Sequence, residues 1–158
     1  MNKVFSRQEA KARLDTARQA GKRIVFTNGC FDILHVGHVR YLKAAKSLGD
    51  LLVLGLNSDA SVRGLKGDRR PLVPEAERAE VLAGLESVDC VVLFDEETPL
   101  SLIQDLRPHV LVKGGDWSED RIVGAAEVRS WGGQVVVAPL VEGRSTTNVV
   151  EKILQVYR

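Results

Sequence analysis

The residues best suited to chemistry are two histidines, His35 and His38, at the end of the stretch 27–38, which reads TNGCFDILHVGH. This stretch follows an apolar run and leads into a pattern typical of a helix. The start of a helix leaves backbone N–H groups unpaired, and its dipole favours anions. Two imidazoles three residues apart add donors on the same side of the turn. The structural alternative is one capping histidine and one surface histidine, but Gly29 and Gly37 favour a phosphate site.

A second cationic segment follows further along the chain. Lys66 has Gly64 and Gly67 on either side, which predicts a mobile loop that can close over substrates. A solvated surface lysine is the alternative interpretation. Three nearby arginines could hold a phosphate through bidentate contacts. They are Arg63, Arg69 and Arg70.

Two more segments carry groups that could bind a ligand. The hydroxyls of Ser145, Thr146 and Thr147 precede the last predicted helix, where they offer a second phosphate site or simply a helix cap. The segment 113–117, KGGDW, ends a predicted strand with a cation, two glycines, an acid and an aromatic residue. Its acid could accept from a ribose hydroxyl or cap a helix, and its tryptophan could line a pocket or pack in the core.

Strands and helices must position these residues, and the pattern of apolar residues predicts five strands. They are 23–28, 51–57, 89–94, 109–113 and 134–138, rich in Val, Ile and Leu with little alternation. Helical patterns cover 6–21, with a capping box at Ser6 and Glu9, and then 36–48, 74–85, 99–106, 119–131 and 146–157. Alternating strands and helices predict an α/β fold, a Rossmann-like doubly wound parallel five-stranded sheet with helices on both faces. The polar motifs would then meet at the carboxyl edge of the sheet.

Composition narrows the class of protein. The chain has 158 residues with 22 Lys and Arg against 21 Asp and Glu, and this net charge of +1 offers no general attraction for nucleic acid. Cys30 and Cys90 are far apart without metal-ligand spacing, so we expect reduced thiols, with Cys90 buried. His109 has no site-like neighbours, and we expect a structural role for it. Without a signal peptide or a bilayer-spanning run, a cytoplasmic protein with no membrane partner is expected.

Several blocks of this chain resemble a known family when they are read in order. His35 to His38 matches the HxGH signature of the nucleotidyltransferase superfamily that includes the cytidylyltransferases. The longer block from Asn28 to His38 is most similar to the D-glycero-D-manno-heptose 1-phosphate adenylyltransferases. The remaining matching blocks are 57–62 (NSDASV), 65–67 (LKG), 70–71 (RP), 112–117 (VKGGDW) and 145–147 (STT). The resemblance covers nearly the whole chain.

The resemblance implies residues 1–158 as a single nucleotidyltransferase domain. Its reaction would be attack by a sugar 1-phosphate on the α-phosphorus of ATP, giving ADP-heptose and pyrophosphate for lipopolysaccharide core biosynthesis. It implies Mg²⁺ carried in with ATP, with no metal site of the protein's own, and a separate heptose 7-phosphate kinase upstream. It is also compatible with a homo-oligomer, although no exposed apolar stripe is apparent in the sequence.

The resemblance and the motifs together predict the roles of individual residues. The catalytic set is His35, His38 and Lys66, with the histidines as donors to the triphosphate that lean towards their protonated form. The predicted nucleotide-binding residues are Asn28, Gly29, Cys30, Phe31, His35, His38, Arg78, Gly115, Asp116, Ser145, Thr146 and Thr147. The predicted sugar-phosphate-binding residues are Asp32, Asn57, Asp59, Arg63, Arg69, Arg70, Lys113 and Trp117.

Some alternatives stay open on the sequence alone. Arg78 could simply pair with Glu75 or Glu77, and Asp32 could cap a turn. A cytidylyltransferase acting on glycerol 3-phosphate or a related phosphate is the nearest rival, because the choice of base is not readable from spacing. The chain has GRSTT where the glycerol-phosphate branch carries an RTxGISTT form, which favours the heptose branch. A nucleotide-binding regulatory module without catalysis is the second alternative.

Overall fold

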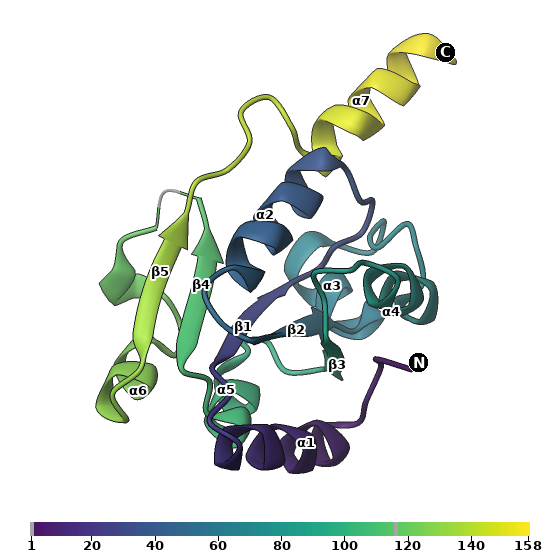
Figure 1. The fold of residues 1–158 in the computed structure, drawn as a ribbon. Coiled ribbons are helices and arrows are strands. Elements are labelled where there is room, and N and C mark those ends of the chain that lie inside the picture. The colour runs from purple at the N-terminus through teal and green to yellow at the C-terminus, as the bar shows by residue number, and fades with distance from the viewer. Residues whose placement is uncertain (1, 116) are drawn as a thin grey trace.

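The computed structural model describes residues 2–115 and 117–158, so Asp116, a predicted nucleotide ligand, lies outside the described residues. Five strands form one parallel sheet in the order β3-β2-β1-β4-β5 (Figure 1). They are β1 Ile24–Gly29, β2 Leu51–Asn57, β3 Cys90–Phe94, β4 Val110–Gly114 and β5 Gln134–Ala138. The order reverses direction beside β1, so the crevice at the end of β1 is the switch point at which such sheets bind ligands.

Helices cover both faces of the sheet, which confirms the predicted fold. Their bounds are α1 Arg7–Gln19, α2 Val36–Lys46, α3 Asp59–Lys66, α4 Glu75–Ala83, α5 Leu100–Leu106, α6 Ala125–Ser130 and α7 Thr146–Val156. Residues of α1, α5 and α6 pack in a core on one face, and residues of α2 and α4 pack in a second core on the other. None of the helices described here is long and apolar enough to cross a membrane.

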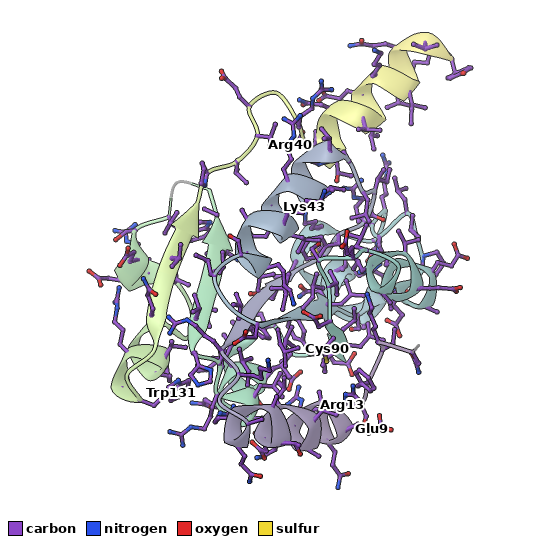
Figure 2. The ribbon with its side chains drawn as sticks, in the orientation of Figure 1. Glu9, Arg13, Arg40, Lys43, Cys90 and Trp131 are labelled. Carbon is purple, nitrogen blue, oxygen red and sulfur yellow. The ribbon has the colours of Figure 1, made fainter. Side chains whose placement is uncertain are left out.

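The outer strand β3 carries Cys90, which lies in the core beneath α1, close to Arg13 (Figure 2). Burial raises the pKa of the Cys90 thiol to about 12, so it stays protonated, as expected for a small core residue. His109 also has the structural role that we expected, because its Nδ1 accepts the backbone N–H of Ile24 at 2.9 Å. The predicted capping box that starts α1 is present at Ser6 and Glu9.

Two local predictions were wrong. The segment around Lys66 is the end of helix α3 and not a loop: the side chain of Ser58 accepts from Ser61 N at the start, and Gly67, with φ +91°, ends it. The predicted helix 119–131 is divided into a 3-10 turn, η1 Glu119–Arg121, and α6. Gly124 has φ +87° between them, a left-handed conformation that ends one helical run before the next begins.

Candidate active site

The carboxyl end of β1 opens into a cleft of about 430 Å³. The start of α2, the end of α3, the end of β4 and the start of α7 line it together. A second hollow of about 360 Å³ lies next to the cleft, on the side of β2 and β4. The two share five lining residues, which are Asn28, Gly29, Cys30, Lys66 and Lys113. The predicted motifs therefore meet at one edge of the sheet.

The two histidines are held by hydrogen bonds to the backbone at the start of α2. His35 is the N-cap residue, and its Nδ1 accepts from Gly37 N at 3.1 Å. His38 Nδ1 accepts from His35 N at 3.3 Å, and the two ring centroids lie 4.0 Å apart. Because Nδ1 is the acceptor in both rings, the neutral rings carry their hydrogen on Nε2. Both side chains line the cleft, so the cap and the site use the same residues.

The prediction that the two histidines lean towards their protonated form concerns rings in contact with a triphosphate, and it stays a prediction; in the protein alone, their surroundings favour the neutral form. Burial is the main cause that lowers the pKa of each ring, and it brings the pKa of His38 to about 4. Nearby cations act in the same direction, with Arg144 lowering the pKa of His35 and Lys66 that of His38. The structure therefore offers two neutral N–H donors, to which the surrounding lysine and arginine add the positive charge.

Two lysines stand where the cleft and the second hollow meet. Lys66 is exposed at the last residue of α3, and Lys113 is half-buried near the end of β4. Burial lowers the pKa of Lys113, and its Nζ lies 5.6 Å from the ring centroid of Trp117. Trp117 lines the second hollow and is half exposed, so it is not packed in the core. The arrangement puts two cations on the path between the two cavities.

The start of α7 forms the wall of the cleft opposite the β1 edge. Ser145 is the N-cap and accepts from Asn148 N at 3.0 Å, and Thr146 Oγ1 donates to Ile33 O at 3.2 Å. The second contact joins α7 to the loop that carries the histidines. Ser145, Thr146 and Thr147 all line the cleft, so hydroxyls and helix-terminal N–H groups face the same space as the imidazoles.

Asp32 is almost fully buried and anchors the segment that follows α3. Its carboxylate accepts the backbone N–H groups of Leu72 and Val73 at 2.9 Å and pairs with Arg70 Nε at 3.2 Å. Both Asp32 and Arg70 line the cleft, whereas Arg63 and Arg69 are exposed and line neither cavity. Of the three predicted arginines, the structure brings Arg70 alone to the site.

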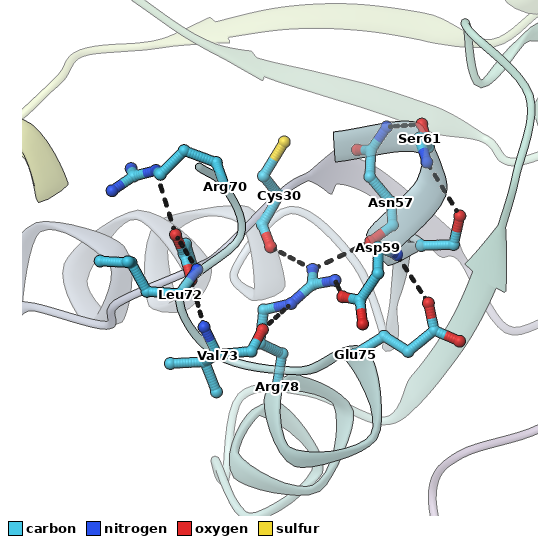
Figure 3. Close-up of polar contacts among 11 residues, drawn as sticks. Cys30, Asn57, Asp59, Ser61, Arg70, Leu72, Val73, Glu75 and Arg78 are labelled. Atoms are coloured by element: carbon cyan, nitrogen blue, oxygen red, sulfur yellow. Dashed lines mark hydrogen bonds and ion pairs between the residues drawn. The ribbon is translucent and has the colours of Figure 1, made fainter. Parts of the chain in front are cut away.

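Arg78 is fully buried below the cleft and does not line it (Figure 3). Its Nε donates to Val73 O at 2.9 Å, and its Nη1 donates to Cys30 O at 2.6 Å and to Asn57 O at 2.9 Å. Its Nη2 pairs with Asp59 at 2.8 Å. The guanidinium thus ties the end of β1, the end of β2 and the segment before α4 together. It positions the backbone of the site from beneath.

The remaining predicted residues fall into two groups. Phe31 lines the cleft with φ +45°, and Asn57 lines the second hollow while its Nδ2 donates to Ser61 Oγ at 2.9 Å. Asp59 is engaged by Arg78 and lines neither cavity. Gly115 has φ +104°, its N–H donates to Ala138 O at the end of β5, and it also lines neither cavity.

Sequence reasoning missed two polar side chains that line the cleft, Tyr41 and Arg144. Tyr41 lies one helical turn after His38, and its hydroxyl lies 2.6 Å from Thr27 Oγ1 and 3.3 Å from Val112 O. The three-residue spacing from His38 was the available signal. Arg144 precedes the Ser-Thr-Thr block and lines the cleft beside His35. Its position next to the cap of α7 could have identified it.

The described residues contain no group of three or more His, Cys, Asp or Glu that could hold a metal ion. Among residues 2–115 and 117–158, Asp32 is the one carboxylate that lines the cleft, and its oxygens already accept from Leu72, Val73 and Arg70. A divalent cation in this cleft would therefore take its ligands mainly from a bound triphosphate and from water.

Comparisons with known proteins agree with this geometry. The family model described as cytidylyltransferase-like matches residues 26–152. The bifunctional protein HldE of Geobacter sulfurreducens is 64% identical over 137 residues, which are 87% of this chain and 28% of that protein. The HldE protein of Syntrophotalea carbinolica is 58% identical over 156 residues, 99% of this chain and 32% of that one. The chain thus spans less than one third of the length of these relatives.

A solved structure shares the fold. The lipopolysaccharide core biosynthesis protein of Thermoplasma volcanium GSS1 superposes with a TM-score of 0.63 at 27% sequence identity. The match covers 78% of this chain and 100% of that one.

Proposed function

Because this chain belongs to the cytidylyltransferase-like family, we propose that it is an adenylyltransferase acting on D-glycero-D-manno-heptose 1-phosphate. It transfers AMP from ATP to the sugar phosphate and gives ADP-heptose and pyrophosphate. The observation that carries this proposal is the convergence of His35, His38, Lys66 and Lys113 with the start of α7 on one cleft. Two polyanions can be gathered there, and each brings negative charge that these groups can stabilise.

The reaction needs no general base. A phosphate monoester is already anionic near neutral pH. One of its oxygens attacks the α-phosphorus of ATP, a new O–P bond forms, and the bond from the α-phosphorus to the bridging oxygen of pyrophosphate breaks. The demand on the protein is to align the two substrates and to stabilise charge on the α-phosphate and the leaving group. Neutral histidines can meet this demand as N–H donors.

The position of each residue in the cleft determines which part of the substrates it would contact. The Nε2–H groups of His35 and His38 donate to triphosphate oxygens from the start of α2, and Ser145 to Thr147 donate from the start of α7. Lys66 and Lys113 stand between the two cavities, where the transferred phosphoryl group would lie. Mg²⁺ bound to ATP would neutralise part of the phosphate charge, in keeping with a cleft in which Asp32, the carboxylate among its described lining residues, is already engaged.

The choice of acceptor rests on similarity. The relatives are named bifunctional protein HldE, and the solved structure at 27% identity is named a lipopolysaccharide core biosynthesis protein. The second hollow, with Asn57 and Trp117, offers polar and aromatic groups for a sugar beside the two lysines. A separate heptose 7-phosphate kinase would act upstream, and its bisphosphate product would have to lose the 7-phosphate before it could serve as the acceptor here.

Pyrophosphate release tests the proposal directly. ATP, CTP and GTP are each incubated with Mg²⁺ and with either heptose 1-phosphate or glycerol 3-phosphate. Release with ATP and heptose 1-phosphate, and with no other pair, is the expected result. Release with CTP and glycerol 3-phosphate would move the protein to the cytidylyltransferase branch. Absence of release with every pair would leave a nucleotide-binding module.

A further inference from the structure

Strands β1 and β4 pair over only part of their length, and the cleft opens where their pairing ends. In the part of the chain that the structure describes, the ladder between these two strands ends at the pair Phe26 and Leu111. The ladders on their outer sides continue further, from β1 to β2 as far as Gly29 and from β4 to β5 as far as Gly114. Each strand therefore keeps its outer neighbour, while the two strands part towards their carboxyl ends (Figure 1).

The hydroxyl of Tyr41 lies at the first position beyond this ladder. One step further in the same register, Thr27 of β1 would stand opposite Val112 of β4, and these are the two residues that the hydroxyl contacts. It donates to Val112 O at 3.3 Å. A phenol has one hydrogen, so Thr27 Oγ1, at 2.6 Å, is then the donor to the phenol oxygen. The side chain thus links the two strands at the point where their main-chain pairing stops.

The ring of Tyr41 lies against the end of β4. It is partly buried and packs against the core on this face of the sheet. Gly114 leaves room for the ring, since a Cβ there would lie 3.3 Å from Tyr41 Cε2. Burial raises the pKa of the Tyr41 hydroxyl to about 12, so the group keeps its hydrogen near neutral pH and remains a donor to Val112 O. The ring therefore sets how closely α2 approaches β4, and the hydroxyl fixes that approach to both strands.

Tyr41 also connects the two sets of groups that would act on the substrates. It belongs to α2, one turn after His38, so its contacts with the sheet fix the helix that carries the histidines. Val112 directly precedes Lys113, which lies where the cleft and the second hollow meet. We propose that Tyr41 is a positioning residue: its hydroxyl fixes the separation of β1 and β4 and, with it, the distance between the histidine donors and Lys113. Its effect on rate rests on the proposed function, whereas its effect on the separation of the strands does not.

Removal of the hydroxyl tests the effect on rate. Tyr41→Phe keeps the ring and Thr27→Val keeps the shape of the buried partner, so both should fold, with thermal midpoints lower by about 2–5 °C. We expect kcat for pyrophosphate release to fall about tenfold in Tyr41→Phe, with KM for both substrates within about twofold, because the reacting groups are displaced while their contacts with the substrates remain.

The double variant tests whether the two residues act through one link. Thr27→Val should lower kcat by no more than Tyr41→Phe does, and the double variant should match Tyr41→Phe, since each change breaks the same connection. An unchanged kcat in Tyr41→Phe would overturn the proposal. Losses that multiply in the double variant would overturn it as well, because the two side chains would then act separately.

The thiol of Cys30 reports on the two strands without any reaction. Cys30 follows the end of β1 and lines both cavities, whereas Cys90 is buried in the core. We expect N-ethylmaleimide to modify Cys30 about fivefold faster in Tyr41→Phe than in the wild type, the factor by which loss of one typical hydrogen bond shifts an opening equilibrium. Cys90 should stay unmodified in both proteins, which shows that the fold as a whole has not opened. Equal rates at Cys30 would overturn the proposal even in a fully active enzyme.

Trp131→Phe is the matched control. It also removes a hydrogen bond from an aromatic side chain to a carbonyl, from Trp131 Nε1 to Pro108 O at 2.9 Å, but at the opposite end of β4. It should lower the thermal midpoint by at least as much as Tyr41→Phe and leave both kcat and the labelling of Cys30 unchanged. Loss of turnover in this control would attribute the effect of Tyr41→Phe to general destabilisation and overturn the proposal. If the wild type released no pyrophosphate with any substrate pair, the proposed function would fail, and the labelling rates would still decide the role of Tyr41.

Discussion

The backbone N–H of His35 donates to Nδ1 of His38 across 3.3 Å, so the two histidines of the cleft are parts of one cap. The same bond settles which nitrogen of His38 carries hydrogen. It also means that the ring has two separable tasks, an acceptor at Nδ1 for the helix start and a donor at Nε2 for the cleft.

Two variants of His38 separate these tasks. In His38→Asn the side-chain oxygen can occupy the place of Nδ1, so the cap survives but the cleft donor is lost. In His38→Gln the amide nitrogen can occupy the place of Nε2. We expect turnover to fall about a hundredfold in His38→Asn, as for a lost transition-state donor, and clearly less in His38→Gln. Steady-state pyrophosphate release measures both, and equal losses would contradict the donor role.

The histidine rings should titrate at unusually low pH. Burial lowers the pKa of His38 to about 4 from the usual 6.5. An NMR titration of the imidazole carbons should show this low value, and ATP should raise it, because a polyanion favours the charged ring. A ring that titrates near 6.5 without ATP would contradict the structure.

The same shift predicts a dependence of stability on pH. Between pH 6.5 and about 4, the unfolded chain binds a proton at His38 that the folded chain does not. The free energy of unfolding therefore falls as the pH falls through this window. Urea denaturation at several pH values measures it. His38→Asn should remove this part of the slope, since its amide does not titrate.

Arg78 should matter for stability more than its helix position suggests. Arg78→Met leaves the Asp59 carboxylate and the carbonyls of Val73, Cys30 and Asn57 without their donor. Loss of one partner from a buried charged network costs about 3–5 kcal/mol. Arg63→Met, at an exposed position on α3, should stay within about 0.5 kcal/mol. Urea denaturation compares the two variants. Similar midpoints would show that Arg78 does not hold these segments together.

Asp32 should act through Arg70. Asp32→Asn keeps an acceptor oxygen for the backbone of Leu72 and Val73 but removes the charge that holds Arg70 at the cleft. We expect KM for the phosphate substrate that Arg70 contacts to rise about tenfold with a smaller change in kcat, as when a binding contact is misplaced. The exposed Asp68→Asn is the control and should leave KM unchanged. An unaltered KM in Asp32→Asn would remove Arg70 from substrate binding.

The strands and most helices of this fold could be predicted from the sequence, because their positions follow from the spacing of apolar residues. The five strands appear within one residue at each end of their predicted bounds, and the capping box of α1 is where Ser6 and Glu9 predicted it. Helix α3 was missed because Gly64 and Gly67 look like loop residues. The Ser58 cap and packing of Val62 outweigh the low helix propensity of Gly64.

The properties of the site residues that the sequence did not predict have a common physical cause. Arg78 looks like any helical arginine beside glutamates, and its burial follows from three carbonyls that come from separate segments. The histidines look like an anion site that favours their charged form. Their pKa is instead set by burial and by Arg144 and Lys66, which come from distant parts of the chain. Spacing along the sequence identifies the groups, but their charge state depends on tertiary neighbours.

A substitution at Gly37 should change the position of the His35 ring without changing the stability of the fold. A Cβ at this position would lie 2.8 Å from Cε1 and Nδ1 of the His35 ring, so Gly37→Ala must displace that ring. A displacement of about 1 Å at a reacting group can cost about a hundredfold in rate. We therefore expect turnover to fall by that order, while the thermal midpoint stays close to that of the wild type because alanine favours the helix.

Gly64→Ala is the matched control, since a Cβ there would meet no atom within 4 Å. It should stabilise α3 by about 0.5–1 kcal/mol and leave turnover unchanged. Steady-state kinetics and thermal denaturation of the two variants give the comparison. If Gly37→Ala kept full turnover, the position of the His35 ring would not matter to the reaction, and the assignment of His35 as a donor would fail with it.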